Sequence, residues 1–386
     1  MGLNKFVDFE KGLVNAGDDT RILGVMQRAL RGEALKLAFL GGSITQGSVA
    51  STPEGCYAYL TYKWWKDSFP KADLTYINAG IGGTTSHLGV GRVEEEVLRH
   101  EPDFIIVEFS VNDADNEPHF QETYESLVRR ILSAKFAPAL LIVHNVRYDD
   151  GGNAEAIHGP IGDHYNLPRV SMKPTIYAQV EAGNIERRDI TPDDLHPNDE
   201  GHALVAGVIT HYLEKERQKA VGMFEQGKGI AVSSGTAFTA ELPAPLTASA
   251  YEKAHRFRND ELTPILCQGF TPDIAEQSCV ADCFKKGWTA SELGAKIVFE
   301  AGGSNLAVQY RKTVRKPAPV ATLTVDGDTA HAVKLDANFD EEWGDCLYLE
   351  TLTEHGEGGK HRIEIEITET HADDKEVFYL VSLICA

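Results

Sequence analysis

The chain contains no run of roughly 18 or more apolar residues, the length that a membrane-spanning helix needs. Its amino-terminal sequence, MGLNKFVDFEKGL, has no basic region, apolar core or small-residue cleavage site of a secretory signal. Basic residues are few, with 37 Lys and Arg against 58 Asp and Glu and a net charge of −21. Nucleic acids and anionic membranes attract clustered cations. We therefore expect a cytoplasmic protein without a nucleic-acid or membrane partner.

Cysteine is scarce as well, with six residues in the chain. They are Cys56, Cys267, Cys279, Cys283, Cys346 and Cys385. In the absence of an export signal, we expect these thiols to be reduced. Cys279 and Cys283 are separated by three residues, but no second pair follows at the distance that a zinc site requires. The sequence therefore predicts no metal site.

The composition changes near residue 220, and two domains are the natural expectation for 386 residues. Upstream of that point, short apolar runs alternate with apolar residues at helical spacing. The predicted strands cover residues 35–40, 74–78, 104–109 and 139–146. The predicted helices cover residues 21–30, 57–69, 90–99, 123–134 and 199–218. This alternation predicts an α/β domain with a doubly wound parallel sheet in residues 1–220, and a long loop over 147–191, where periodicity is poor.

The remaining residues, 221–386, are richer in Gly, Ser, Thr and Pro. Short apolar runs recur there, at 297–299, 306–308, 320–325, 346–349 and 377–383. Residues 361–367, HRIEIEI, alternate charged and apolar side chains, as a strand with one solvent-exposed face does. Residues 325–328, VDGD, are suited to a hairpin turn. These features predict an antiparallel β-sandwich as the second domain.

The first predicted strand ends in two glycines and a serine, within the stretch ALKLAFLGGSITQG at residues 34–47. Glycine adopts positive φ at no steric cost, so Gly41 and Gly42 allow a sharp turn directly before Ser43. Open α/β sheets carry their chemistry at such turns, at the carboxyl ends of buried strands. The arrangement follows the logic of a nucleophile elbow, although the G-x-S-x-G pattern itself is absent. Ser43 is therefore a candidate nucleophile.

Three later positions supply the partners that a serine nucleophile needs. The second strand leads to Gly83 and the third to Asn112, and parallel neighbours bring such ends to one rim of the sheet. After the long loop comes DDLHP, in which Asp193 lies three residues before His196 and can reach its ring. His196 would take the serine proton, and Asp193 would hold the histidine tautomer. The N–H groups of Ser43 and Gly83 and the side-chain amide of Asn112 would form the oxyanion hole.

An ordinary structural role is open to each of these residues taken alone. Asn112 suits a turn, His196 suits a loop packed ahead of the last helix, and Gly83 suits the start of a helix. Asp194 competes with Asp193 as the acid, although the spacing favours Asp193. Three other histidines in loop-like stretches are rival bases: His87, His158 and His164. Neither His87 nor His164 follows a carboxylate at the same spacing.

Together and in this order, the motifs resemble those of the SGNH, or GDSL-type, hydrolase superfamily. Residues 41–45 (GGSIT) resemble its first block, 78–84 (NAGIGGT) the second, 111–113 (VND) the third and 193–197 (DDLHP) the last. The resemblance extends over about residues 34–216. It implies a flavodoxin-like, three-layer parallel sheet, and it supports the roles given to Ser43, His196, Asp193, Gly83 and Asn112.

Two residues depart from the superfamily pattern. Gly42 stands where an aspartate is usual, and Ser110 stands where a glycine is usual, two residues before Asn112. The Gly-Gly-Ser-Ile-Thr form recurs in carbohydrate esterases of the superfamily. The two-domain architecture also resembles carbohydrate acetyl esterases, in particular carbohydrate esterase family seventeen, which acts on acetylated mannan fragments. The resemblance implies a serine esterase that needs no cofactor and removes O-acetyl groups from manno- or xylo-oligosaccharides.

Other functions remain open on the sequence. A lysophospholipase or thioesterase of the same superfamily would need a long apolar channel rather than a small acyl pocket. The chain could instead be a glycan-binding protein, with Trp288 and Trp343 as stacking platforms in the second domain, although core packing is the alternative for each. The sandwich could also join copies of the chain into a homo-oligomer.

Overall fold

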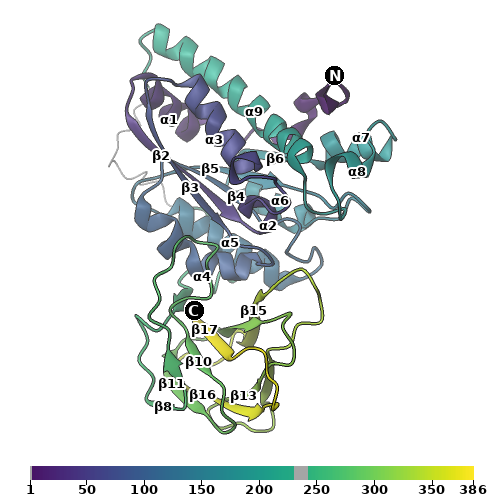
Figure 1. The fold of residues 1–386 in the computed structure, drawn as a ribbon. Helices are drawn as coiled ribbons and strands as arrows, with labels where there is room; N and C mark the ends of the chain where they lie inside the picture. Colours follow the sequence, from purple (N-terminus) through teal and green to yellow (C-terminus); the bar gives the residue numbers. More distant parts are fainter. Residues whose placement is uncertain (1, 230–241) are drawn as a thin grey trace. The chain divides into compact units, whose positions relative to one another are not determined.

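The structure is a computed structural model that describes residues 2–229 and 242–386 (Figure 1). The chain divides into two compact units, Met1–Ser249 and Ala250–Ala386. Across the described residues, no helix is both long enough and apolar enough to cross a membrane. All six cysteines are free thiols.

The first unit is built on a six-stranded sheet in the order β1-β6-β5-β4-β2-β3. Its strands are β1 Leu13–Asn15, β2 Ala34–Gly41, β3 Asp73–Gly80, β4 Phe104–Glu108, β5 Ala139–His144 and β6 Arg169–Ser171. Strands β2 to β6 pair in parallel, and β1 is antiparallel to β6. Every residue of β4 and β5 is buried, as expected for strands with both faces covered.

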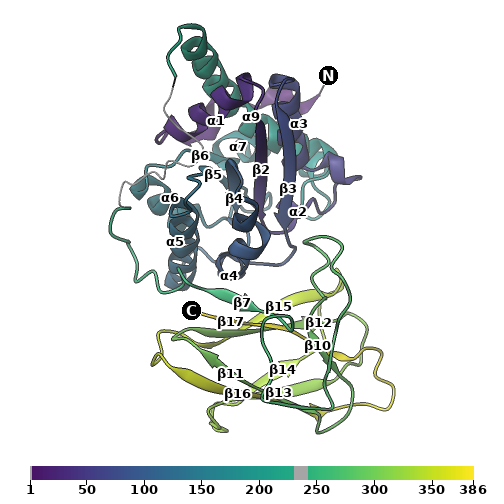
Figure 2. The same ribbon diagram turned by 90° about the vertical axis from the view of Figure 1, so that its left-hand side faces the viewer.

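Helices cover both faces of this sheet (Figures 1 and 2). One layer contains α1 Thr20–Leu30, α3 Tyr57–Ser68 and α9 Asp199–Glu225, and the other contains α4 Ser86–Glu96, α5 Pro118–Leu132 and α6 Glu155–His164. The first unit also contains shorter helical elements: η1 Leu3–Phe6, η2 Phe9–Gly12, α2 Ser43–Gln46, η3 Pro53–Gly55 and η4 Leu98–His100. The predicted three-layer α/β fold is confirmed.

The long loop predicted over residues 147–191 is wrong, because several short elements occupy that segment. Besides α6 and β6, they are the π-helix η5 Lys173–Tyr177, α7 Ala178–Glu181 and α8 Arg187–Ile190. Most are too short to show a periodic pattern, and α6 contains Pro160 and two glycines. One of them, Gly162, is required by close packing, since a Cβ there would lie 2.2 Å from Cδ of Arg169.

The boundary between the two units lies after Ser249, later in the chain than residue 220, where the change in composition predicted it. Helix α9 continues to Glu225, and Ala220 is fully buried in the core of the first unit. Further along the chain, the N–H groups of Leu246 and Thr247 each donate to the carboxylate of Glu125 in α5 at 2.7 Å. Residues that follow the change in composition can therefore still belong to the first unit, because their backbone groups find hydrogen-bond partners there.

The second unit contains two antiparallel sheets (Figure 2). One has the order β15-β12-β17-β10-β9 with β7 also paired to β17, and the other has the order β14-β13-β16-β11-β8. The strands are β7 His255–Phe257, β8 Leu266–Gln268, β9 Thr271–Pro272, β10 Trp288–Ala290, β11 Lys296–Gly302, β12 Leu306–Lys312, β13 Val320–Val325, β14 Val333–Asp336, β15 Cys346–Thr353, β16 Lys360–Glu369 and β17 Phe378–Cys385. Apolar side chains from both sheets share one core, which confirms the predicted β-sandwich.

Candidate active site

The turn between β2 and α2 places Ser43 at the first residue of a helix. Neither Gly41 nor Gly42 has a positive φ, so the reason predicted for the two glycines is wrong. Close packing is the reason instead. A Cβ on Gly41 would lie 2.5 Å from the carbonyl oxygen of Glu108, and a Cβ on Gly42 would lie 2.3 Å from Asn112 Oδ1. At Gly41 the neighbour is backbone and cannot give way, whereas at Gly42 a larger residue would displace the Asn112 side chain.

Ser43, His196 and Asp193 form one chain of hydrogen bonds. Ser43 Oγ lies 2.8 Å from His196 Nε2, and His196 Nδ1 lies 2.6 Å from Asp193 Oδ2. The other carboxylate oxygen, Asp193 Oδ1, accepts the N–H groups of Leu195 at 3.0 Å and of His196 at 2.7 Å. Thr191 Oγ1 donates to the same oxygen at 3.2 Å. The loop therefore folds around the carboxylate that faces the histidine ring.

The charge on Asp193 is stabilised by these contacts. Partial burial acts to raise its pKa, but hydrogen bonds from the His196 ring and from the N–H groups of His196 and Leu195 outweigh burial, and the pKa lies below its ordinary value. An ionised carboxylate can only accept at Nδ1, so Nδ1 of His196 carries a hydrogen. In neutral histidine, Nε2 is then the acceptor for the Ser43 hydroxyl. Ser43 itself is only 6% exposed.

Gly83 and Asn112 are the two other predicted oxyanion donors. Gly83 has φ +68° and is exposed. The preceding Gly82 lies against Ser43, since a Cβ built on Gly82 would be 3.6 Å from Ser43 Cβ, and its N–H donates to Gln46 Oε1 at 2.6 Å. Asn112 turns its amide oxygen toward Gly42, and Nδ2 lies farther away, 3.5 Å from a Cβ built on Gly42.

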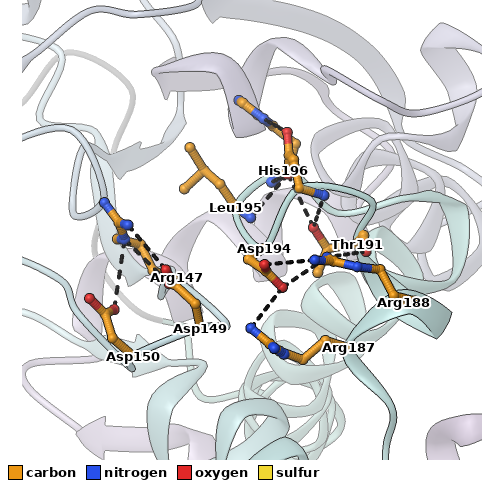
Figure 3. Close-up of polar contacts among 10 residues, drawn as sticks. Arg147, Asp149, Asp150, Arg187, Arg188, Thr191, Asp194, Leu195 and His196 are labelled. Carbon is orange, nitrogen blue, oxygen red and sulfur yellow. Dashed lines mark hydrogen bonds and ion pairs between the residues drawn. The ribbon is translucent and has the colours of Figure 1, made fainter.

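The rival bases and the rival acid are engaged elsewhere. His158 is buried, and its Nε2 lies 2.9 Å from Asp113 Oδ2. His87 is buried, which together with nearby His119 lowers its pKa to about 3. His164 Nε2 lies 2.7 Å from the carbonyl oxygen of Ala244. The carboxylate of Asp194 faces Arg187 and Arg188 rather than a histidine (Figure 3).

The two tryptophans proposed to stack on sugars differ in exposure. Trp288 is 2% exposed and packs edge-on against Phe299 in the sandwich core, with ring centroids 4.9 Å apart. A ring buried in this way cannot stack on a sugar, so the prediction for Trp288 is wrong. Trp343 is 55% exposed and packs edge-on against Phe339, with centroids 5.1 Å apart.

Glu108 is a buried carboxyl group close to this site that sequence reasoning missed. It ends β4, and its Oε1 accepts the N–H of Ser110 at 2.9 Å and the Ser110 hydroxyl at 2.8 Å. Ser110 Oγ also lies 3.0 Å from the carbonyl oxygen of Asn145, which follows β5. The unusual serine two residues before Asn112 was the available signal, because its hydroxyl bridges the ends of two neighbouring strands.

Burial, together with the nearby charge of Asp113, raises the pKa of Glu108 from 4.5 to about 7. Between these values the folded state holds a proton that the unfolded state releases. The free energy of unfolding should therefore fall as the pH rises through this window, by about 1.4 kcal/mol per pH unit. In Glu108→Gln this fall should disappear. Denaturant unfolding at pH 5 and pH 8 measures it, and an equal pH dependence in both proteins would contradict the expectation.

The chain is similar to solved esterase structures and matches a family model of lipases and acylhydrolases. A solved two-domain esterase, active on acetylated mannans and co-crystallized with mannopentaose, is 55% identical to this chain. The match covers 98% of each chain, with a TM-score of 0.90. Residues 39–204 match the model of the GDSL-like Lipase/Acylhydrolase family. The chain belongs to this family, as the SGNH resemblance predicted.

Two curated relatives match a little under half of the chain at lower identity. Thioesterase 1/protease 1/lysophospholipase L1 of Escherichia coli (strain K12) is 25% identical over 187 residues, which is 46% of this chain and 83% of that protein. Acetylxylan esterase of Geobacillus stearothermophilus is 23% identical over 202 residues, which is 45% of this chain and 92% of that protein.

Proposed function

We propose that this protein is a serine esterase that removes O-acetyl groups from acetylated manno-oligosaccharides. The observation that carries the proposal is the hydrogen-bonded chain from Ser43 through His196 to Asp193. It lies in a chain that is 55% identical, over both domains, to an esterase active on acetylated mannans. We assign catalysis to the first unit and glycan recognition to the sandwich.

The proposed reaction has two steps. In the first, Ser43 Oγ attacks the acetyl carbonyl carbon while His196 takes the hydroxyl proton, and the collapsing intermediate expels the sugar oxygen, which receives that proton. An acetyl-enzyme remains. In the second step, His196 takes a proton from water, the resulting hydroxide attacks the same carbon, and acetic acid leaves as Ser43 regains its proton from His196; the acid then ionises to acetate in solution. Asp193 stabilises the imidazolium in both steps and is not itself protonated.

Negative charge develops on the acetyl oxygen in each step. The backbone N–H of Ser43, the N–H of Gly83 and Nδ2 of Asn112 are the proposed donors to it. The Gly82 N–H is already directed to Gln46, and the exposed Gly83 follows it in the same turn. Removal of a single donor of this kind typically lowers kcat by about 10²- to 10³-fold.

Gly42→Ala tests the placement of Asn112. The new Cβ would lie 2.3 Å from Asn112 Oδ1, and a side-chain amide can rotate away at little cost to folding. We expect kcat on p-nitrophenyl acetate to fall by about 10²-fold, the loss expected for one oxyanion donor. Asn112→Ala should give a similar loss, and the double variant should lose no more than either single variant. Independent, multiplying losses would contradict the assignment.

The test of substrate class is a comparison of four compounds with the full chain. Acetate release should be fastest from acetylated manno-oligosaccharides, slower from acetylated xylo-oligosaccharides, and negligible hydrolysis should occur with a lysophospholipid or a long-chain acyl thioester. Faster hydrolysis of either long-chain compound would favour the lysophospholipase or thioesterase alternative. That alternative has less support, because the relative with these activities in its name matches 46% of this chain.

The sandwich remains the proposed glycan-recognition unit, with Trp343 as its candidate stacking residue. The ring is 55% exposed, and its Nε1 donates to Glu341. Trp343→Ala should raise KM for an acetylated manno-oligosaccharide and leave p-nitrophenyl acetate hydrolysis unchanged. An unchanged KM for both compounds would leave Trp343 without a part in recognition.

A further inference from the structure

Asp193 and Asp194 are adjacent and carry the same carboxylate group, yet the two carboxylates contact different residues. Asp193 faces His196. Asp194 faces two arginines of α8, and Arg188 binds it through two parallel hydrogen bonds, Nη1 to Oδ1 and Nη2 to Oδ2, each 2.8 Å long (Figure 3). Arg187 Nη1 lies 3.1 Å from Asp194 Oδ1. A paired guanidinium fixes direction as well as distance, because both groups are planar.

The backbone at Asp194 is held from a second direction. Its carbonyl oxygen accepts the N–H of Tyr148 at 2.7 Å, from the segment that follows β5. Asp194 also has φ +67°, in the left-handed region that costs most residues energy but that aspartate and asparagine tolerate better than others. Its side chain is 20% exposed, less than that of Arg187 at 44% or Arg188 at 58%. Residue 194 therefore has a defined conformation supported by α8 and by Tyr148.

This conformation determines how Asp193 meets His196. Residue 194 lies directly between Asp193 and the two N–H groups, of Leu195 and His196, that the Asp193 carboxylate accepts. A change of backbone angles at 194 would turn the carboxylate of Asp193 away from these groups and from the imidazole. Small displacements of this kind matter, since a misplacement of about 1 Å can lower a rate by about 10²-fold.

We propose that Asp194 is a positioning residue of the active site, which acts with Arg187 and Arg188 to hold the loop that directs Asp193 and His196 toward Ser43. The inference rests on the proposed function and goes beyond it, because it gives the second aspartate of the pair a role separate from that of the first. Asp194 does not touch the reacting atoms. Exposed ion pairs contribute little to stability, so the effect should appear in the rate more than in folding.

The experiment compares three variants of the full chain. Asp194→Ala removes the ion pairs and the tolerance of the left-handed conformation, Asp194→Asn removes only the charge, and Arg187→Ala/Arg188→Ala removes the partners. We expect kcat to fall about 10-fold or more in Asp194→Ala, within the range for a misplaced group, with KM for an acetylated manno-oligosaccharide unchanged. Asp194→Asn and the double arginine variant should each show a smaller fall in kcat. Combining them should add nothing, because both remove the same ion pairs.

Arg147→Ala is the matched control. Arg147 is an exposed arginine near the same loop, and its side chain pairs with Asp149 and Asp150 rather than with Asp194, as Figure 3 shows. Its removal should leave kcat and KM unchanged. A second readout is the proton resonance of His196 Nδ1–H, which the short contact to Asp193 shifts downfield. That resonance should broaden or move in Asp194→Ala and persist in Arg147→Ala.

The results separate the inference from the proposed function. Unchanged kcat and an unchanged Nδ1–H resonance in Asp194→Ala would overturn the inference, even if Ser43→Ala abolishes acetate release. A rise in KM alone would also overturn it, since that would show substrate binding rather than positioning. Wild-type kcat in Asp194→Asn and in the double arginine variant would overturn the part assigned to the ion pairs. Full acetate release by Ser43→Ala would instead remove the proposed function itself.

Discussion

Ser43→Ala is expected to lower kcat for acetate release from acetylated manno-oligosaccharides by about 10⁶-fold, the loss typical for a serine that acts as a unit with its histidine. The substitution removes the only protein atom proposed to bond to the acetyl carbon. It also removes the partner of His196 Nε2, 2.8 Å away, while the bond from Nδ1 to Asp193 remains. The fold should therefore persist. Acetate assays under saturating substrate, together with thermal unfolding, measure both effects.

Ser171→Ala provides the matched control for this variant. Ser171 is also a buried serine, in β6, and its hydroxyl donates to Glu155 Oε2 at 2.8 Å. Loss of that hydrogen bond should lower stability by about 1 kcal/mol and leave kcat unchanged. Retention of a substantial part of the wild-type rate by Ser43→Ala would show that the ester is cleaved without this hydroxyl.

Asp193→Asn is expected to lower kcat by about 10⁴-fold, the loss observed when the acid that orients a catalytic histidine becomes an amide. The amide oxygen can keep the N–H bonds from Leu195 and His196, so the loop should stay in place. Nδ2 then faces His196 Nδ1 as a donor. The imidazole must take the other tautomer, with its hydrogen on Nε2, and it can no longer accept the proton of Ser43.

Stability at low pH should change in the same variant. The pKa of Asp193 is below its ordinary value in the folded protein. A lowered pKa contributes stability above the unfolded-state value, and this contribution is lost as the pH falls through the folded-state value. Asp193→Asn removes this contribution, so its stability should depend less on pH in the acidic range. Unfolding of both proteins at several pH values below 5 measures the difference.

Asp328→Asn is the control for the motif itself. Asp328 lies three residues before His331 in the second unit, and its Oδ2 is 2.7 Å from His331 Nδ1, the same spacing and nearly the same contact as in the active site. Its loss should leave acetate release unchanged. A fall in kcat comparable to that of Asp193→Asn would mean that the amide substitution acts through general destabilisation rather than through the tautomer of His196.

Most of the α/β architecture was predictable from local patterns. The run around Phe39 and the sequence FIIVEF are apolar because both faces of those strands are covered. Such a run indicates a buried strand even when its neighbours in the sheet are unknown. The segment 147–191 failed because its elements are short, and α6 contains Pro160. The boundary near residue 220 failed because helix α9 continues to Glu225, and a composition change does not show where backbone groups find their partners.

The amino-acid sequence by itself determined the layered sheet, the sandwich and the set of residues able to perform ester hydrolysis, because strand burial and residue chemistry are local properties. Only the tertiary structure decided between equivalent candidates. Asp193 and Asp194 differ by one position, and the motif of Asp193 with His196 occurs again at Asp328 and His331. Asp193 and His196 reach a serine because the loop after α8 lies beside the end of β2. The distance between this loop and β2 depends on the packing of segments far apart in the sequence, and no local pattern contains it.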